Sequence, residues 1–277
     1  MILFLVLVIV VSNVGPSDAR CSMYGICERR NGYLYPCVAN RTASLVNTIH
    51  LDPETVKWFG QLCPRYSLNQ DMCCDHDQIE LLVETLNGEL RRWFYRCPAC
   101  YANIASLYCS VTCDTNQSGF LSTSKLSTRD SFASYIYIEG SKWYVDQLFG
   151  SCEHVRYWQR DSLKAMDFFC EGCSADEFYK RLLRDYPLKP SRTFGMVTQR
   201  IGLRNELWSC PEVVSGFGSA CSCADCNTCH VTTGPPEETT ALSINNDKNN
   251  ASPGLSVGTL SLVYLVCCTF SMTFFIV

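Results

Sequence analysis

The residues best suited to chemistry stand in one short stretch, MCCDHDQIELL at positions 72–82. A histidine can act as a general base on water, and a neighbouring aspartate can help to hold calcium. Here His76 and Asp77 follow two adjacent cysteines and open a segment whose apolar residues recur at helical spacing. The first activity to consider is therefore calcium-dependent lipid hydrolysis.

The spacing does not support that activity. In secreted phospholipases A2 the histidine lies one helical turn after the cysteine pair, whereas His76 follows Cys74 after a single residue. The upstream segment YGICERRNGY has charged residues where a calcium-binding loop needs glycines. We therefore expect His76 and Asp77 to be exposed residues of a first helical turn, where an aspartate favours the helix dipole, and we expect the protein not to be an enzyme.

Two cysteine motifs raise metal and redox chemistry instead. CSCADCNTCH at 221–230 has zinc-like spacing, and CPAC at 97–100 looks like a thioredoxin motif. Of 20 cysteines, Cys267 and Cys268 lie in the C-terminal tail, which leaves 20 − 2 = 18. In an oxidising compartment this even number predicts nine structural disulfides, although spacing leaves their connectivity open. We expect no bound metal and no cofactor.

Both ends of the chain are apolar and predict entry into the secretory pathway. Residues 2–11 form an apolar run followed by small residues, which predicts a signal peptide over residues 1–19. Residues 255–277 form an apolar tail, and no charge follows Lys248. The small triplet that starts at Asn250 fits a GPI-attachment site, with a single membrane span as the alternative. We expect a GPI-anchored protein on the extracellular face of the plasma membrane or in the endolysosomal lumen.

Between these ends the chain predicts one domain and a stalk. Residues 20–230 are dense in cysteine and aromatic residues, whereas residues 231–254 contain neither and are too polar to order themselves. Asn40, Asn116 and Asn250 begin glycosylation sequons, and we expect glycans on Asn40 and Asn116. The net charge of −4 does not favour nucleic acid as a partner.

Local patterns predict an α+β domain, mostly helical, with a small mixed β-sheet. Asp75 and Gln78 form a capping box before an apolar repeat that continues to Leu90, and Ser174 with Glu177 forms a second box. Further helices are expected over residues 98–109 and 142–151. Extended segments are expected around residues 33–38, 135–138 and 193–198.

The cysteine context resembles a known family. RCPACYANIASLYCSVTCDTNQSGFL (96–121), LCPRY, MCCDHDQ and CSCADC resemble the N-terminal luminal sterol-binding domain of the Niemann–Pick type C family of cholesterol transporters. CSMYGICERRNGYLYPC resembles the opening segment of that domain. The resemblance covers about residues 21–230 and gives all 18 cysteines a counterpart. It implies a stand-alone anchored copy of a sterol-binding domain, without the family's multi-span membrane portion.

The resemblance also implies the disulfide pairing. The implied pairs are Cys21–Cys73, Cys27–Cys37, Cys63–Cys109, Cys74–Cys113, Cys97–Cys221, Cys100–Cys152, Cys170–Cys173, Cys210–Cys226 and Cys223–Cys229.

In the family a deep apolar pocket holds the sterol, and a Gln at the position of Gln78 binds the 3β-hydroxyl. The capping box competes for the same side chain. At the position of the family's second hydroxyl partner, an Asn, stands Pro36, while Ile26 and Met23 replace an acidic residue and a Trp. The implied pocket wall comprises Leu82, Tyr101, Asn103, Tyr108 and Thr112, and the implied mouth comprises Phe168 and Phe169.

The predicted function is to bind a cholesterol-like 3β-hydroxysterol and to present or transfer it at a membrane surface. The expected partners are the sterol, the membrane through the C-terminal anchor, and a sterol donor or acceptor protein. Two alternatives remain. One is a folate- or riboflavin-receptor-like module, and the other is a cell-surface ectodomain that binds a protein.

Overall fold

The computed structural model describes residues 20–30, 33–157, 160–184, 186–187, 192–198, 203 and 207–226. The chain divides into two units, residues 1–231 and 232–277, and every described residue belongs to the first. The predicted signal peptide, the stalk, Asn250 and the apolar tail lie outside the described residues. Within the described ranges, no helix has the length and apolarity needed to cross a bilayer.

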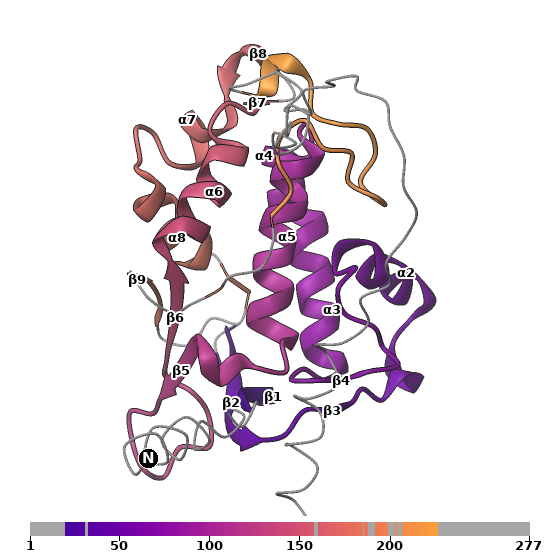
Figure 1. Cartoon of the computed structure of the whole chain (residues 1–277). Helices are drawn as coiled ribbons and strands as arrows, with labels where there is room; N and C mark the ends of the chain where they lie inside the picture. The colour runs from indigo at the N-terminus through magenta and orange to yellow at the C-terminus, as the bar shows by residue number, and fades with distance from the viewer. Residues whose placement is uncertain are drawn as a thin grey trace, which may run out of the picture. The chain divides into compact units, whose positions relative to one another are not determined.

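Helix α5 (Pro98–Cys113) runs through the centre of the domain (Figure 1). All of its residues are buried, so it has no solvent face and only weak amphipathic patterning. Pro98 occupies the first helical position, where its missing N–H costs nothing. The predicted helix over residues 98–109 is confirmed and extends to Cys113.

Helices α2 (Pro53–Leu62), α3 (His76–Thr85) and α4 (Arg91–Phe94) pack beside α5. Asp52 caps α2 by accepting from the backbone N–H groups of Glu54 and Thr55, both at 2.9 Å. The apolar repeat predicted one helix as far as Leu90. Instead, α3 and α4 are joined by the η2 segment (Leu86–Leu90), in which Gly88 has a non-helical ψ of −122°.

The strands form small separate sheets. β1 (Cys21–Arg30) pairs antiparallel with β2 (Tyr33–Arg41), β3 (Ser44–Leu45) with β4 (Asp71–Met72), and β7 (Arg156–Tyr157) with β8 (Arg160–Lys164). The three-stranded sheet is mixed: β6 (Tyr135–Ser141) pairs antiparallel with β5 (Leu121–Ser124) and parallel with β9 (Arg192–Thr198). The α+β class with a small mixed sheet is therefore confirmed.

Helices α6 (Lys142–Cys152), α7 (Ala165–Phe169) and α8 (Ala175–Arg184) complete the domain. The predicted box at Ser174 is present: its backbone N–H donates to Glu177 Oε2 at 2.8 Å. α8 lies against β9 so closely that a Cβ on Gly195 would meet Leu183 at 2.8 Å. In the part of the chain that the structure describes, three 3₁₀ turns connect these elements: η1 (Thr48–His50), η3 (Gln117–Gly119) and η4 (Cys223–Asp225).

Eight disulfides join the described cysteines, and they are eight of the nine pairs that the resemblance implies. Cys223 is also disulfide-bonded, but its implied partner Cys229 lies outside the described residues. Four of the eight bonds reach α5 or its N-cap, which ties this helix to segments far apart in the chain.

Candidate functional site

The start of α3 is clamped between β1 and α5. Cys73 is bonded to Cys21 at the beginning of β1, and Cys74 is bonded to Cys113 at the end of α5. The backbone N–H of Cys73 also donates to the carbonyl oxygen of Cys113 at 3.0 Å. Two adjacent cysteines therefore fix one helix start to two other elements.

Gln78 lies inside this clamp and is 1% exposed. Its Oε1 accepts from the backbone N–H of Asp75 at 3.1 Å, and the Asp75 side chain accepts from the backbone N–H of Gln78 at 3.0 Å. The predicted capping box is therefore present. The same Oε1 also accepts from the backbone N–H of Gly25 in β1 at 2.6 Å.

The other end of this amide, Nε2, is buried and has no hydrogen-bond partner among the described residues. Its identity as nitrogen is fixed by chemistry, because both partners of the opposite atom are backbone N–H groups, which an oxygen alone can accept. The cap and a ligand therefore need not compete for Gln78: the oxygen forms the cap, and a donor remains. An unpaired buried donor costs about 1–3 kcal/mol, so a ligand that accepts from it recovers free energy.

Gly25 allows β1 to approach α3 this closely. It has a φ of +74°, and a Cβ there would lie 2.8 Å from Asp75 Oδ2. Burial raises the pKa of the Asp75 carboxyl, although the hydrogen bond from the Gln78 backbone opposes the rise. The backbone that presents Gln78 is thus tightly constrained.

The three positions at which the resemblance implies a departure from the family lie on β1 and β2. Met23 and Pro36 are buried and Ile26 is half-buried, and Ile26 pairs directly with Pro36. The Pro36 carbonyl oxygen accepts from the backbone N–H of Ala133 at 2.8 Å. None of the three side chains carries a hydrogen-bonding nitrogen or oxygen, so these three positions offer no polar group to a ligand.

The predicted wall residues are all buried, but their polar atoms face different neighbours. The Tyr101 hydroxyl donates to the Leu86 carbonyl at 2.8 Å. The Asn103 amide binds the backbone N–H and the carbonyl of Trp208, each at 2.9 Å. It thereby fixes residues 207–226, here called the C-terminal segment, to α5.

Tyr108 and Thr112 face the end of α8. The Tyr108 hydroxyl donates to the Leu182 carbonyl at 2.6 Å, and the Thr112 hydroxyl shares a hydrogen bond with the Tyr186 hydroxyl at 2.7 Å. Leu82, on α3, is fully buried in the core cluster. The structure therefore brings Tyr108 and Thr112 together and directs Asn103 elsewhere.

The two phenylalanines of α7 point in different directions. Phe168 is 48% exposed and contacts the rings of Trp93 and Tyr157. Phe169 is 8% exposed and packs edge-on against Phe94 and Phe178.

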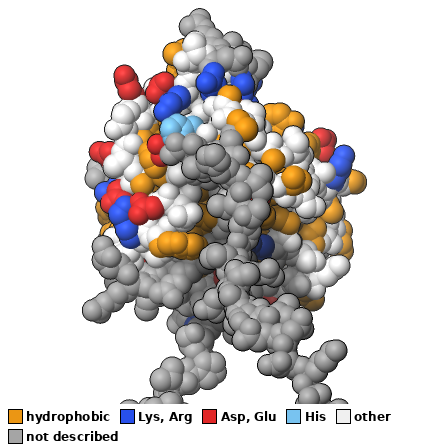
Figure 2. Space-filling model, turned by 45° about the horizontal axis from the view of Figure 1, so that its top comes forward, with side chains coloured by type: hydrophobic (Ala, Val, Ile, Leu, Met, Phe, Trp, Pro, Cys, Tyr) orange, Lys and Arg blue, Asp and Glu red, His pale blue; other side chains and the backbone are white. Residues whose placement is uncertain are grey.

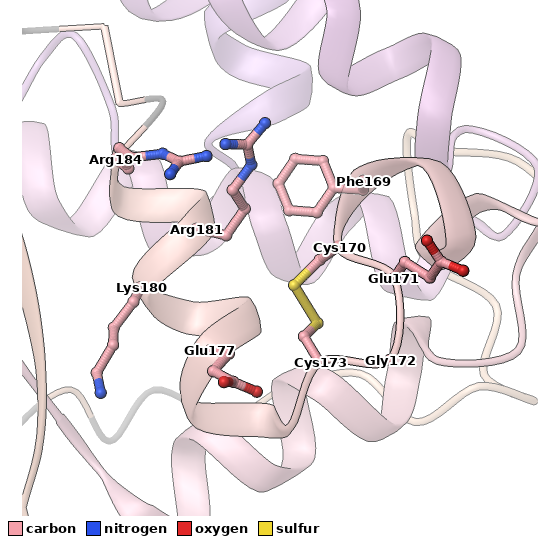
Figure 3. Close-up of a pocket in the computed structure, with 9 residues that line it drawn as sticks. All are labelled: Phe169, Cys170, Glu171, Gly172, Cys173, Glu177, Lys180, Arg181 and Arg184. Atoms are coloured by element: carbon pink, nitrogen blue, oxygen red, sulfur yellow. A yellow bond between two sulfur atoms is a disulfide. The ribbon is translucent and has the colours of Figure 1, made fainter.

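Phe169 also lines a surface cleft of about 510 Å³ with the Cys170–Cys173 disulfide and the basic side chains of α8 (Figure 3). The Arg181 guanidinium faces the Phe169 ring, 5.7 Å from its centroid. A second cleft, of about 480 Å³, lies between α2 and the segment 66–69. Neither cleft is lined by Gln78 or by the predicted wall.

Several buried polar groups were not anticipated from the sequence. The hydroxyls of Tyr144 and Tyr179 and that of Ser106 are buried without a hydrogen-bond partner in the described part of the chain. Burial raises the pKa of the Tyr179 hydroxyl well above its ordinary value. Their apolar neighbours in sequence mark them as core, and nothing local shows that a hydroxyl would be left unpaired.

Gln117 was also missed as a structural residue. Its Oε1 accepts from the backbone N–H groups of Ser22 and Met23 at 3.1 and 3.2 Å. Its Nε2 donates to the carbonyls of Val111 and Thr112 at 3.1 and 2.8 Å. The partners in β1 lie about 95 residues away in sequence, so no spacing rule could have found them.

The residues that suggested hydrolysis lie at the surface and contact one another and Arg29. His76 Nε2 lies 3.6 Å from Asp77 Oδ1, and Arg29 lies 3.4 Å from the other Asp77 oxygen. The His76 ring packs on that of His50, with centroids 5.0 Å apart. About a third of each of the His76 and Asp77 side chains is exposed, as expected for a first helical turn.

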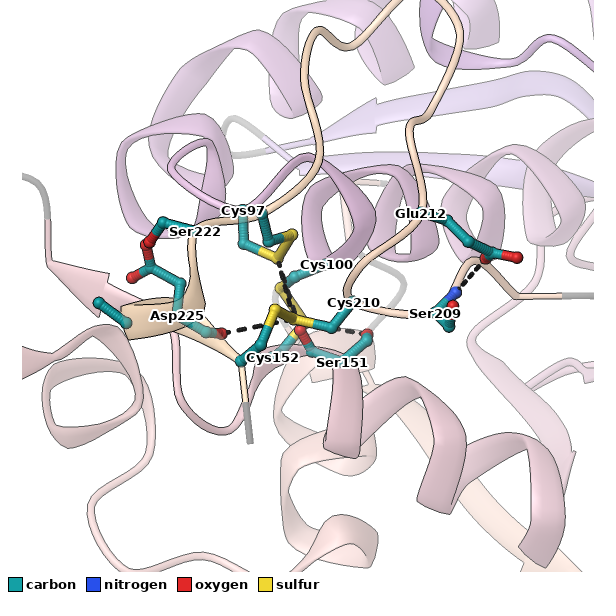
Figure 4. Close-up of a disulfide and its surroundings, with 12 residues drawn as sticks. Cys97, Cys100, Ser151, Cys152, Ser209, Cys210, Glu212, Ser222 and Asp225 are labelled. Carbon is teal, nitrogen blue, oxygen red and sulfur yellow. Dashed lines mark hydrogen bonds between the residues drawn. A yellow bond between two sulfur atoms is a disulfide. The ribbon is translucent and has the colours of Figure 1, made fainter. Parts of the chain in front are cut away.

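Cys97 and Cys100 of the CPAC motif lie with Cys210 at the N-terminus of α5 (Figure 4), and two cysteines of the zinc-like motif, Cys221 and Cys226, are bonded to Cys97 and Cys210. Cys97 Sγ lies 3.9 Å from Cys210 Sγ, and Cys221 is close to both. All three are disulfide-bonded, and a cysteine in a disulfide offers no thiolate to a metal. The cluster therefore acts as a covalent staple between α5 and the C-terminal segment.

Comparison with known proteins assigns the class of the domain. The model of the family described as Niemann-Pick C1 N terminus matches residues 18–246. The chain belongs to this family, in agreement with the resemblance in its cysteine context.

The similar proteins are named as cholesterol transporters. The chain is 26% identical over 164 residues to "NPC intracellular cholesterol transporter 1 homolog 1" of Caenorhabditis elegans, covering 54% of this chain and 12% of that protein. It is 25% identical over 191 residues to "NPC intracellular cholesterol transporter 1" of Sus scrofa, covering 60% and 14%. It is 30% identical over 186 residues to "NPC intracellular cholesterol transporter 1 homolog 1b" of Drosophila melanogaster, also covering 60% and 14%. The match thus spans only about an eighth of the length of these relatives.

Proposed function

We propose that this protein binds a sterol with its polar head against Gln78 and presents or transfers it at a membrane surface. The observation that carries the proposal is the buried Gln78 Nε2, which has no partner among the described residues. The N-terminal domain family and its cholesterol-transporting relatives supply the ligand class.

The energetics divide between the body and the head of such a ligand. Burying the carbons of a steroid at roughly 0.8 kcal/mol per CH₂ gives on the order of 10 kcal/mol before ordering costs. One hydrogen bond adds only about 1 kcal/mol. Apolar shape should therefore set affinity, and the contact with Gln78 should favour a sterol whose head carries a hydrogen-bond acceptor.

The free group of Gln78 is a donor, and the neighbouring strand positions add no polar side chain. A hydroxyl oxygen and a ketone oxygen can both accept from an amide N–H. We therefore expect the wild-type protein to discriminate weakly between a 3β-hydroxysterol and the corresponding 3-ketosteroid.

The sharpest test is Gln78→Glu in a titration with labelled sterol. The substitution keeps an oxygen for the cap and, at a pH high enough to ionise the buried carboxyl, replaces the free N–H by an acceptor. The variant should retain the 3β-hydroxysterol, whose O–H can donate, and should lose about 1–3 kcal/mol of affinity for the 3-ketosteroid. Unchanged binding of both ligands would mean that the sterol head lies elsewhere.

Gln117→Glu is the matched control, because it alters a second buried amide that is fully paired. It should lower thermal stability and leave the affinity ratio of the two ligands unchanged. His76→Ala should alter neither property, since its ring lies at the surface with Asp77 and His50.

The identity of the ligand can be tested without any assumption about Gln78. Mass spectrometry of lipids extracted from the purified protein should find a sterol. Absorption above the protein band would instead indicate a flavin or pterin and would favour the folate- or riboflavin-receptor-like alternative. Neither a sterol nor a chromophore would favour a protein-binding ectodomain.

The anchoring is proposed on the sequence of residues 250–277, with glycans on Asn40 and Asn116. Both asparagines are exposed and therefore open to modification. Phosphatidylinositol-specific phospholipase C should release the protein from the extracellular face of cells. Retention that only detergent overcomes would indicate a single membrane span.

A further inference from the structure

An exposed aromatic cluster lies where β7, α4 and α7 meet. It consists of Trp93, Tyr157 and Phe168, here called the aromatic trio, whose ring centroids lie 4.9–5.6 Å apart. Phe168 is 48% exposed, and Trp93 and Tyr157 are half-buried. Tryptophan and tyrosine are the residues that proteins place at the boundary between water and lipid, because each ring is apolar with a polar edge.

Basic side chains accompany the trio. Arg92 lies next to Trp93 on α4, and Lys164 ends β8 just before α7; both are exposed. Figure 2, in which the top of Figure 1 comes forward, shows Lys and Arg side chains and a histidine beside hydrophobic ones, with some Asp or Glu side chains among them. The Lys164 Nζ lies 3.3 Å from His154 Nδ1. Such cations attract anionic lipid headgroups, each by about 1 kcal/mol.

The last described residues of the chain, 222–226, lie at the same end of the domain as the aromatic trio. Buried Asp225 accepts from the backbone N–H of Arg156 at 2.8 Å and pairs with Arg96 at 3.0 Å. Arg156 is the neighbour of Tyr157 in β7, so residues 222–226 are fixed beside the trio (Figure 1). The sequence predicts that the polar residues 231–254 and the apolar tail that follows them tether the chain to a bilayer.

The two sequons of the described domain lie at the opposite end of α5. The Asn40 side chain accepts from Arg20 at 3.2 Å, and Ser118, which completes the sequon of Asn116, donates its backbone N–H to the Arg20 carbonyl. This end adjoins Cys113, the last residue of α5, whereas the C-terminal segment is bonded to Cys97 at the helix start. A 16-residue helix separates the two ends by about 24 Å. Glycans at the sequons would leave the trio uncovered.

From these observations we infer that the aromatic trio, with Arg92 and Lys164, is a surface that docks on the bilayer carrying the protein's own anchor. The occupant is a lipid interface rather than another protein. If the docking surface exists, sterol can enter directly from that bilayer. Only this consequence rests on the proposed function. The contact itself can be measured without a sterol.

The contact is tested with the full-length chain reconstituted in vesicles whose phospholipids carry bromine on their acyl chains. Bromine quenches tryptophan fluorescence only at short range. The fluorescence intensity lost to quenching should fall in Trp93→Phe and should be unchanged in Trp143→Phe. Trp143 is a suitable control because it is 57% exposed and lies at the start of α6, whereas the end of α6 is bonded to Cys100 near the trio. Equal quenching in the wild type and in Trp93→Phe would overturn the inference. The same result is expected if the trio binds a protein instead of a bilayer.

The charges are tested by Lys164→Gln. Replacing part of the phosphatidylcholine by phosphatidylserine should strengthen the docking of the wild type. The increase in affinity should be about fivefold smaller in the variant. An equal increase in the variant would show that Lys164 is not part of the docking surface.

The consequence for sterol is tested by comparing two routes of loading. Tyr157→Ser should slow sterol uptake from vesicles and leave equilibrium binding of sterol supplied in detergent unchanged, whereas Tyr95→Ser, an exposed tyrosine outside the trio, should affect neither. If Trp93 is quenched but no sterol binds by either route, docking holds and the proposed function fails. If sterol binds but Trp93 is not quenched, the proposed function holds and docking fails.

Discussion

Gln78 and Gln117 are two buried amides that bind the same strand, and they differ in one hydrogen-bonding group. Each oxygen accepts from backbone N–H groups of β1. Gln117 also uses its nitrogen, which donates to two carbonyls at the end of α5. Gln78 uses only its oxygen and leaves its nitrogen unpaired among the described residues. The comparison teaches that a buried amide can serve the fold with one end and stay available to a ligand with the other.

The largest effect should come from removing the fully paired amide. Gln117→Ala leaves two backbone N–H groups and two carbonyls without their partner, so the free energy of unfolding should fall by about 3–5 kcal/mol. Chemical denaturation with the disulfides intact would measure it. The folded fraction should bind sterol as the wild type does. A loss of sterol affinity as large as that in Gln78→Ala would mean that the two glutamines do not differ in their role toward the ligand.

Gln78→Ala should cost less stability but should affect both properties. Losing the cap and the contact with Gly25 should lower the free energy of unfolding by about 2–3 kcal/mol. Sterol affinity should fall by a further 1–3 kcal/mol, at roughly the cost of one lost buried contact. Thermal unfolding and sterol titration of the same preparation separate the two. A loss of stability without a loss of sterol affinity would mean that Gln78, like Gln117, serves only the fold.

Pro36→Asn should sharpen the comparison by adding a polar group to the strand beside Gln78. Pro36 is buried opposite Ile26. An asparagine there would offer a second partner to the ligand head, and 3β-hydroxysterol should bind more tightly by about 1 kcal/mol. The control is the same substitution at the neighbouring position of the strand, Tyr35→Asn, where the side chain is half-buried and packs against Phe132. No gain in Pro36→Asn would place the head outside the reach of β2.

The smallest effect concerns pH. Burial raises the pKa of Asp75 in the folded protein above the ordinary value of 3.8, so the folded state holds this proton more tightly than the unfolded state. The stabilisation is complete below the unfolded pKa and is lost as pH rises through the folded pKa. Asp75→Asn keeps a capping side chain and should flatten this slope in unfolding experiments across the acid range. A slope identical to that of the wild type would assign the proton to another group.

Much of this site could be predicted from the sequence because its signals are local. The capping box needs only Asp75 and Gln78, three residues apart, and the resemblance placed the cysteine pair beside it. That the two roles of Gln78 are compatible could not be predicted, because it depends on Gly25, 53 residues away, meeting the same oxygen.

Other features were missed for the same reason. The break at Gly88 interrupts an apolar repeat that continues through it, so periodicity alone predicted one longer helix. The trio joins Trp93, Tyr157 and Phe168 from three separate elements, and only the packing of α4 against β7 and α7 brings them together. Contacts between distant segments leave no mark in residue spacing.

The covalent staple at the start of α5 has a mechanical consequence. A pull on the chain beyond Cys226 would pass through the Cys210–Cys226 bond and, along the backbone to Cys221, through the bond to Cys97. The load would then reach a helix that three further disulfides hold at Cys100, Cys109 and Cys113. Tension from a tether would thus be carried by sulfur–sulfur bonds into the core, and no strand pair would have to resist it by hydrogen bonds alone.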